Sequence, residues 1–205
     1  MNTSSVLLLD RDTFTTRLAS LGDQPVAVAQ TDIDGFLLVN EEHGREVGNA
    51  VIAVVQAALA ANLPRGSFMT RIGGDEFACA IPGASPEEAL IAVEEIRQHL
   101  AGRAHDVAGE RMPIRITAGI AAAPHHTDET ARLPRLADQA MHRAKLEGGG
   151  RVTIFMEDKM VLKSNYYRRA QLARLAAISA RLGRTEASLL RDALDELLQT
   201  HRDDC

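Results

Sequence analysis

The sequence predicts an α+β fold in which a central, mainly antiparallel sheet is flanked by helices and followed by a small C-terminal strand-helix-helix module. Strand-like runs alternate with helical patterns as far as residue 155, which predicts the first part. A change in charge balance predicts the second, because residues 1–158 contain 14 Lys and Arg against 22 Asp and Glu, whereas residues 159–205 contain 9 against 6. We therefore expect two domains, 1–158 and 159–205.

The composition is that of a folded protein, with 45% hydrophobic and 25% charged residues. The longest apolar stretch, Val51–Ala61, is shorter than the roughly 18 residues that a membrane-spanning helix requires. The short run Val6–Leu9 lacks the basic leader of a secretory signal. Cys79 and Cys205 provide neither a disulfide framework nor a metal-ligand cluster. We expect a cytoplasmic protein with no membrane anchor.

The first strong strand pattern covers residues 25–33 and ends in an acidic cluster. A helix follows from Glu41 to about Asn62, and Pro64 stops it. Two further apolar runs, Ser67–Ile72 and Phe77–Pro82, flank the turn-rich quartet 73–76, which predicts a β-hairpin with acidic residues at its tip.

The remaining elements of the first domain follow from caps and breakers. Ser85 begins a capping-box pattern with Pro86 at the first helical position, which predicts a helix as far as Leu100. A strand is expected over residues 114–121, a helix over 133–146 that ends at three glycines, and a last strand over 151–155.

The hairpin carries a recognisable motif. The segment Arg71–Phe77 contains the sequence GGDEF in full, residues 31–44 read TDIDGFLLVNEEHG, and the later helix contains Ala137-Asp138 and Ala144-Lys145. Over residues 10–156 the chain resembles the GGDEF family of diguanylate cyclases. The resemblance implies a nucleotide-cyclase-like palm that condenses two GTP molecules into cyclic di-GMP and two pyrophosphates as a homodimer.

Elementary chemistry supports a metal site at this hairpin. Mg²⁺ or Mn²⁺ needs converging oxygen ligands, and Asp32 and Asp75 can supply them together with the backbone carbonyl of Ile33 if their strands are neighbours. Gly73 and Gly74 leave the tip open to a nucleotide. The alternative is a set of solvated turn acids. For Asp34 the structural and functional interpretations both stay open.

The resemblance also assigns roles to individual residues. It places Glu76 in metal binding or in activation of the attacking 3′-hydroxyl, and Asp75 beside it as a catalytic residue. The nucleotide contacts that it implies are Gly35, Phe36, Asn40, Asn49, Gly73, Gly74 and Lys145.

Three positions depart from the family pattern. Asn49 stands where the family has an aspartate that contacts guanine, and asparagine accepts hydrogen bonds only through its oxygen. A mixed or adenine-containing cyclic dinucleotide is therefore conceivable. Leu37 and Gly149 replace a lysine and an arginine that contact phosphate, which favours slow turnover. The inhibitory Arg-x-x-Asp of many relatives is absent from residues 64–67.

The C-terminal module predicts a strand over 159–167 and two amphipathic helices separated by Gly183-Arg184-Thr185. Residues 174–198 resemble the ribbon-helix-helix family, whose paired strands read double-stranded DNA. The resemblance makes Lys163, Asn165, Arg168 and Arg169 candidate DNA contacts. The other interpretations are a dimerisation device or a helical hairpin alone. A second function follows for the whole chain, that of a catalytically weak nucleotide sensor that regulates a DNA-binding transcription factor.

Overall fold

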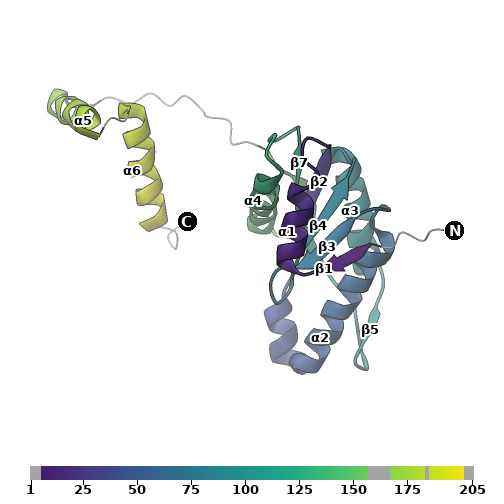
Figure 1. Ribbon diagram of the computed structural model, residues 1–205. Coiled ribbons are helices and arrows are strands. Elements are labelled where there is room, and N and C mark those ends of the chain that lie inside the picture. The colour runs from purple at the N-terminus through teal and green to yellow at the C-terminus, as the bar shows by residue number, and fades with distance from the viewer. Residues whose placement is uncertain (1–5, 157–166, 183–184, 201–205) are drawn as a thin grey trace. The chain divides into compact units, whose positions relative to one another are not determined.

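The computed structural model describes residues 6–156, 167–182 and 185–200 (Figure 1). The chain divides into two compact units, Met1–Asp158 and Lys159–Cys205. Among the described residues, no helix is both long and apolar enough to cross a membrane.

The first unit is built on a mixed six-stranded sheet with the strand order β1-β3-β4-β2-β7-β8. Its inner pairings, β3 with β4, β4 with β2 and β2 with β7, are antiparallel, as expected. The pairings of both edge strands, β1 with β3 and β7 with β8, are parallel. The strands are β1 (Leu7–Leu9), β2 (Val26–Ile33), β3 (Phe68–Arg71), β4 (Glu76–Pro82), β7 (Ile116–Ala123) and β8 (Val152–Ile154).

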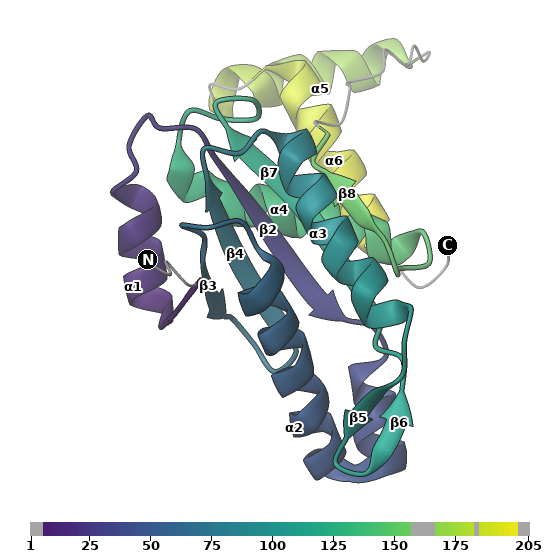
Figure 2. The ribbon, with the colours of Figure 1, turned by 90° about the vertical axis from the view of Figure 1, so that its right-hand side faces the viewer.

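Helices cover both faces of this sheet, as Figure 2 shows from one side. The helices α2 (Phe36–Asn62) and α3 (Pro86–Ala101) pack on one face over an aliphatic core. The helices α1 (Arg11–Ala19) and α4 (Leu133–Leu146) pack on the other face. A short 3₁₀ turn, η1 (Thr130–Arg132), leads into α4. The expected helix over 133–146 and the Ser85 capping box are confirmed.

The helix expected from Glu41 begins five residues earlier, at Phe36, because Gly35 adopts a left-handed conformation directly after β2. Gly44 interrupts α2 with φ 84° and ψ 167°, values that are open to glycine and strained for other residues. The helix therefore consists of two segments that meet at a kink. The predicted start at Glu41 lies within the first segment, so the apolar periodicity missed residues 36–40 and the kink.

Three small elements were not expected. The edge strand β1 has three residues, and β5 (His105–Val107) pairs with β6 (Glu110–Met112) in a separate two-stranded ribbon. Helix α1 begins at Arg11 and is capped by Asp10, whose carboxylate accepts a hydrogen bond from the Thr13 amide. Strand β7 begins at Ile116 rather than at Ile114, because the Ile114 amide donates to the Leu100 carbonyl instead of joining the sheet.

The second unit contains α5 (Arg169–Leu182) and α6 (Glu186–Thr200), which contact each other. Several large apolar side chains on these helices are exposed, among them Leu172, Leu182, Leu194 and Leu197. The strand expected over 159–167 lies outside the described residues except for Tyr167, which is not in a strand.

Candidate functional site

Strand β2 sends alternate side chains to opposite faces of the sheet, and this alternation determines where the acids point. Val26 and Val28 belong to the core beneath α1 and α4, whereas Ala27 and Ala29 belong to the core beneath α2 and α3. The same alternation predicts that Asp32 faces α4. The structure agrees, since the carboxylate Oδ2 of Asp32 lies 2.6 Å from Nζ of Lys145 at the C-terminal end of α4.

The hairpin brings a second carboxylate to the same face. In the antiparallel register of β2 with β4, Asp32 lies directly opposite Glu76. Side chains opposite each other in such a pair have Cβ atoms about 4.5–5.5 Å apart, and like charges there are destabilising. Asp75 is held beside them, because the Ile33 amide donates to its carbonyl at 3.3 Å. The fold thus gathers three acidic residues at the ends of two adjacent strands.

The environment of Asp32 is unfavourable for a charge. Its side chain is buried, with 8% relative exposure, and this burial raises the pKa of the carboxyl above its ordinary value. The Lys145 ammonium opposes that rise, whereas the negative charges of Asp75 and Glu76 add to it. A nearby cation therefore stabilises the ionised form of Asp32, and the Lys145 ammonium has this role in the structure.

The tip of the hairpin is fixed by arginine side chains. Nε of Arg71 donates to the carbonyl oxygens of Gly73 and Gly74, each at 3.1 Å, and Arg11 of α1 donates to the carbonyl of Ile72. A Cβ at position 73 would lie 3.1 Å from Oε2 of Glu76, so glycine leaves that carboxylate room. Neither arginine was expected to act here, although Arg71 lies only two residues before the motif.

Asp34 is the acid whose role the sequence left open. Its two carboxylate oxygens accept hydrogen bonds from the Thr117 hydroxyl at 2.5 Å and from the Gly150 amide at 2.9 Å. The same amide lies 2.8 Å from the Thr117 hydroxyl oxygen. Asp34 therefore joins the end of β2 to β7 and to the glycine turn after α4, which favours the structural interpretation.

The start of α2 carries the expected base contacts. The side chain of Asn40 lies against Gly48, and a Cβ at position 48 would overlap with Oδ1 of Asn40. Gly48 is buried, and the neighbouring Asn49 is exposed. The kink at Gly44 thus folds the first segment of α2 back so that Asn40 approaches the segment that carries Asn49. The glycine within an apolar helical pattern was the available signal for this contact.

Residues at the beginning of α2 are open to solvent. Gly35 forms the N-terminal cap without any side-chain hydrogen bond, so backbone amides of the first turn have no side-chain acceptor. Phe36 is partly buried, and Leu37 is 69% exposed. An exposed leucine at this place can make no ionic contact to phosphate.

The position of Lys145 depends on how closely α4 packs on the sheet. At Gly119 of β7 a Cβ would overlap with backbone atoms of Ala137 and Met141, so only glycine permits this approach. Gly149 has no side chain and so provides no positive charge for a phosphate. Arg151 pairs with Glu147 at 2.9 Å, which supports a surface ion pair rather than a replacement phosphate contact.

A divalent cation such as Mg²⁺ needs several oxygen ligands around it. Within the described ranges, no three His, Cys, Asp or Glu side chains converge as a complete metal-ligand group. Mg²⁺, however, is commonly held by one or two carboxylates together with substrate phosphates and water. Asp32 and Asp75 are close enough for the charge of Asp75 to raise the pKa of Asp32, and two neighbouring carboxylates fit that partial shell.

The candidate DNA contacts are only partly described. Lys163 and Asn165 lie outside the described residues. Arg168 and Arg169 are exposed at the beginning of α5, and the Arg168 amide donates to Oε1 of Gln171.

Comparison with known proteins identifies this arrangement. Residues 5–151 match the family model described as "Diguanylate cyclase, GGDEF domain". The response regulator PleD of Caulobacter vibrioides is 32% identical over 132 residues, which are 63% of this chain and 29% of PleD. The diguanylate cyclase DgcP of Pseudomonas aeruginosa is 33% identical over 133 residues, 65% of this chain and 19% of that protein. The chain therefore spans less than a third of either relative.

Solved structures agree with the sequence match. The GGDEF domain of PA1120 (YfiN or TpbB) from Pseudomonas aeruginosa superposes with a TM-score of 0.69 at 29% identity, covering 73% of this chain and 91% of that one. The active GGEEF domain of a diguanylate cyclase from Vibrio cholerae gives a TM-score of 0.59 at 26% identity, with 71% and 92% coverage. The first unit is a palm-like α+β domain of the nucleotide-cyclase class. The chain belongs to the GGDEF diguanylate cyclase family.

Proposed function

We propose that the chain is a diguanylate cyclase that condenses two GTP molecules into cyclic di-GMP with release of two pyrophosphates. The observation that carries this proposal is the cross-strand pair of Asp32 and Glu76, flanked by Asp75 and neutralised by a single lysine. Two carboxylates that face each other across a strand pair repel and lower the stability of the fold, so a catalytic purpose would explain why they are there. The relatives whose names include diguanylate cyclase support the same reaction.

In this proposal Asp32, Asp75 and the Ile33 carbonyl would hold Mg²⁺ or Mn²⁺, which would neutralise negative charge on the triphosphate oxygens. Lys145 turns from Asp32 to the phosphates, Gly73 and Gly74 admit the nucleotide backbone, and Gly35 and Phe36 present amides to it. Asn40 and Asn49 contact the base.

Glu76 lies beside this centre and accepts the proton of the attacking 3′-hydroxyl. The 3′-oxygen forms a bond to the α-phosphorus of the second GTP, and the bond between the α-phosphorus and the bridging oxygen breaks. Pyrophosphate leaves with that oxygen. One domain binds one nucleotide, so a second copy must present the other, and the cycle closes when the step is repeated in the opposite direction.

The test is incubation of the full chain with GTP and Mg²⁺, followed by mass spectrometry of the products. Asp75→Ala should abolish cyclic di-GMP, and Glu76→Gln should lower the rate by roughly 100-fold or more. Asp23→Ala is the matched control, since Asp23 is an exposed acid before the opposite end of β2. Product formation that survives in Asp75→Ala would refute the assignment. Equal GTP and ATP in one reaction reveals whether Asn49 permits a mixed or adenine-containing product.

A second candidate function is favoured by the three departures at Leu37, Asn49 and Gly149 and by the separate second unit. In it the GGDEF domain binds nucleotide with little turnover, and the C-terminal unit dimerises as a ribbon-helix-helix-like module that binds double-stranded DNA. The exposed leucines of α5 and α6 support dimerisation. The observation that selects this function is nucleotide binding without product, together with a DNA footprint that Arg168→Ala/Arg169→Ala removes.

A further inference from the structure

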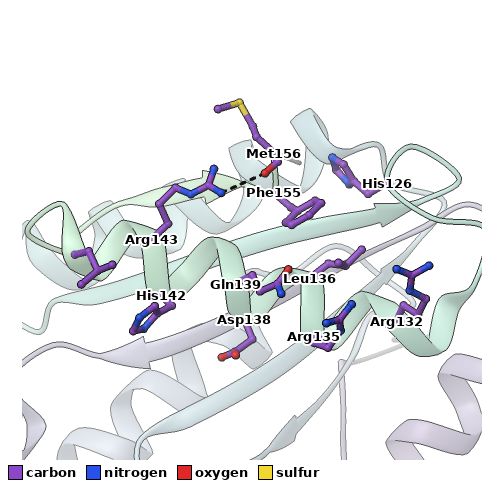
Figure 3. Close-up of a pocket in the computed structure, with 11 residues that line it drawn as sticks. His126, Arg132, Arg135, Leu136, Asp138, Gln139, His142, Arg143, Phe155 and Met156 are labelled. Carbon is purple, nitrogen blue, oxygen red and sulfur yellow. Dashed lines mark hydrogen bonds between the residues drawn. The ribbon is translucent and has the colours of Figure 1, made fainter. Parts of the chain in front are cut away.

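A groove lies along α4 in the first unit. It has a volume of about 590 Å³ and is bordered by α4, the end of β8 and the loop after β7 (Figure 3). We call it the basic groove and define it by Arg132, Arg135, Leu136, Gln139, Arg143 and Phe155. All of these residues belong to the first unit. The groove is separate from the catalytic edge, because Lys145 and Asp32 do not line it.

The charge of the groove is opposite to that of its domain. Residues 1–158 carry 22 acidic against 14 basic residues, yet three arginines line this one hollow. The single acid that lines it, Asp138, accepts a hydrogen bond from Gln30 on the β2 side of α4. In the part of the chain that the structure describes, Arg132 and Arg135 have neither an ion-pair partner nor a side-chain hydrogen bond. Arg143, by contrast, donates to the Met156 carbonyl at 3.3 Å (Figure 3). The guanidinium groups of Arg132 and Arg135 are therefore the ones that can attract an anion into the hollow without losing a partner.

The groove also has an apolar and partly aromatic border. Leu136 is buried, Phe155 is half-buried, and the exposed Met156 extends the wall outward. The ring of His126 meets Phe155 edge-on, with 5.6 Å between ring centroids. Nδ1 of His126 accepts a hydrogen bond from the Ala122 amide, which fixes the ring. A flat, partly apolar ligand surface can pack against such a wall.

The spacing of the arginines limits the ligand. Arg135 and Arg143 are eight positions apart on α4, which corresponds to about 12 Å along the axis. A ligand with anionic groups at separate points and a planar apolar body beside them can use both arginines and the apolar wall at once.

We propose that the basic groove is a second nucleotide-binding site, which takes a ligand with two or more phosphate groups. The phosphates contact Arg132, Arg135 and Arg143, Gln139 bonds to a polar edge, and the base packs against Phe155 and Leu136. This site is independent of the catalytic carboxylates and of the base contacts on α2. Its occupation does not require turnover.

The test is an NMR titration of the full, ¹⁵N-labelled chain with GTP, ATP, cyclic di-GMP and inorganic pyrophosphate, each without divalent cation. At least one nucleotide should shift the amide signals of Gln139 and Phe155. In Arg132→Ala/Arg135→Ala that response should need roughly tenfold or more ligand. The matched control is Arg103→Ala/Arg111→Ala, which removes the same charge at exposed positions near the β5–β6 ribbon.

Signals of Gly73 and Gly74 report the catalytic hairpin separately, so failure of one site is distinguishable from failure of the other. Unchanged Gln139 and Phe155 signals with all three nucleotides would overturn the proposal. The same holds if Arg132→Ala/Arg135→Ala binds as tightly as the control. If pyrophosphate binds the groove as strongly as any nucleotide, the base-stacking wall is refuted and with it the nucleotide assignment.

Discussion

Asp32 and Asp34 are two residues apart at the C-terminal end of β2, yet their removal should affect stability to very different extents. Asp34 accepts two hydrogen bonds, at 2.5 and 2.9 Å, from groups of two other chain segments. Hydrogen bonds to a charged group contribute about 1.5–3 kcal/mol each. The Gly150 amide retains Thr117 as a second acceptor, so only part of this sum is lost. We expect Asp34→Ala to lower the free energy of unfolding by about 2–3 kcal/mol.

Asp32→Ala should behave differently at pH 7. Because burial raises the folded-state pKa of Asp32, its stabilising contribution is complete only below the unfolded value of 3.8 and is lost as pH rises through the folded pKa. At neutral pH the variant loses the ion pair with the partly exposed Lys145 and also loses the repulsion from Glu76. These effects oppose each other, and the net change should stay within about 1 kcal/mol.

Thermal unfolding followed by circular dichroism at pH 7 measures both variants. For a domain of this size, the Asp34→Ala change corresponds to a fall in Tm of roughly 4–12 °C. A double-mutant cycle with Thr117→Val should give a coupling energy of about 1 kcal/mol or more, since the two side chains are in direct contact. If Asp34→Ala costs less than about 0.5 kcal/mol, or the coupling is absent, the assigned role of Asp34 is wrong.

Two further predictions concern single buried positions. Gly48→Ala should raise KM for GTP by roughly tenfold, because the added Cβ displaces the Asn40 side chain, and should not lower the helix content, because alanine favours a helix. Steady-state kinetics measure KM and circular dichroism measures the helix content; an unchanged KM would refute the contact between Asn40 and position 48. Burial raises the pKa of the Cys79 thiol to about 12, so in a Cys205→Ser background it should not react with a thiol reagent at pH 8 until the protein unfolds; stoichiometric labelling of the folded chain would contradict this.

The sequence predicted those parts of the fold that depend on local pattern. The hairpin tip, the helix that ends at Lys145 and the Ser85 cap all follow from residues close together in the chain. The parallel pairings of β1 and β8 did not, since they join segments that share no turn and the strands are only three residues long. A short edge strand carries too few residues for a periodic signal.

The candidate site shows the same division. The motif drew attention to Asp32, Asp75 and Glu76, but no spacing of residues in the sequence predicted that Asp34 would accept hydrogen bonds from Thr117 and Gly150. That bond depends on a register between β2 and β7 that only the folded sheet defines. In the same way, the overlap of Asn40 with position 48 follows from the kink at Gly44 and not from helical periodicity alone.

Lys145 gives the most direct test of how the charged centre operates, because one ammonium group has two competing partners. In the structure it pairs with Asp32 at 2.6 Å, with a side chain that is 37% exposed. If it must leave Asp32 before a divalent cation binds there, Lys145→Met removes a competitor as well as a phosphate contact. The two losses act on different ligands and have opposite signs.

We therefore expect Lys145→Met to bind Mn²⁺ alone roughly two- to fivefold more tightly, since an ion pair with a partly exposed lysine contributes about 1 kcal/mol or less. Binding of GTP should weaken by roughly tenfold, since a charge-assisted bond to phosphate is lost. Isothermal titration with each ligand measures the two changes, and Arg151→Met is the control because Arg151 is paired with Glu147 instead. If both affinities fall together, Lys145 supports the carboxylates rather than competing for them, and the proposed transfer of this lysine from Asp32 to the nucleotide is wrong.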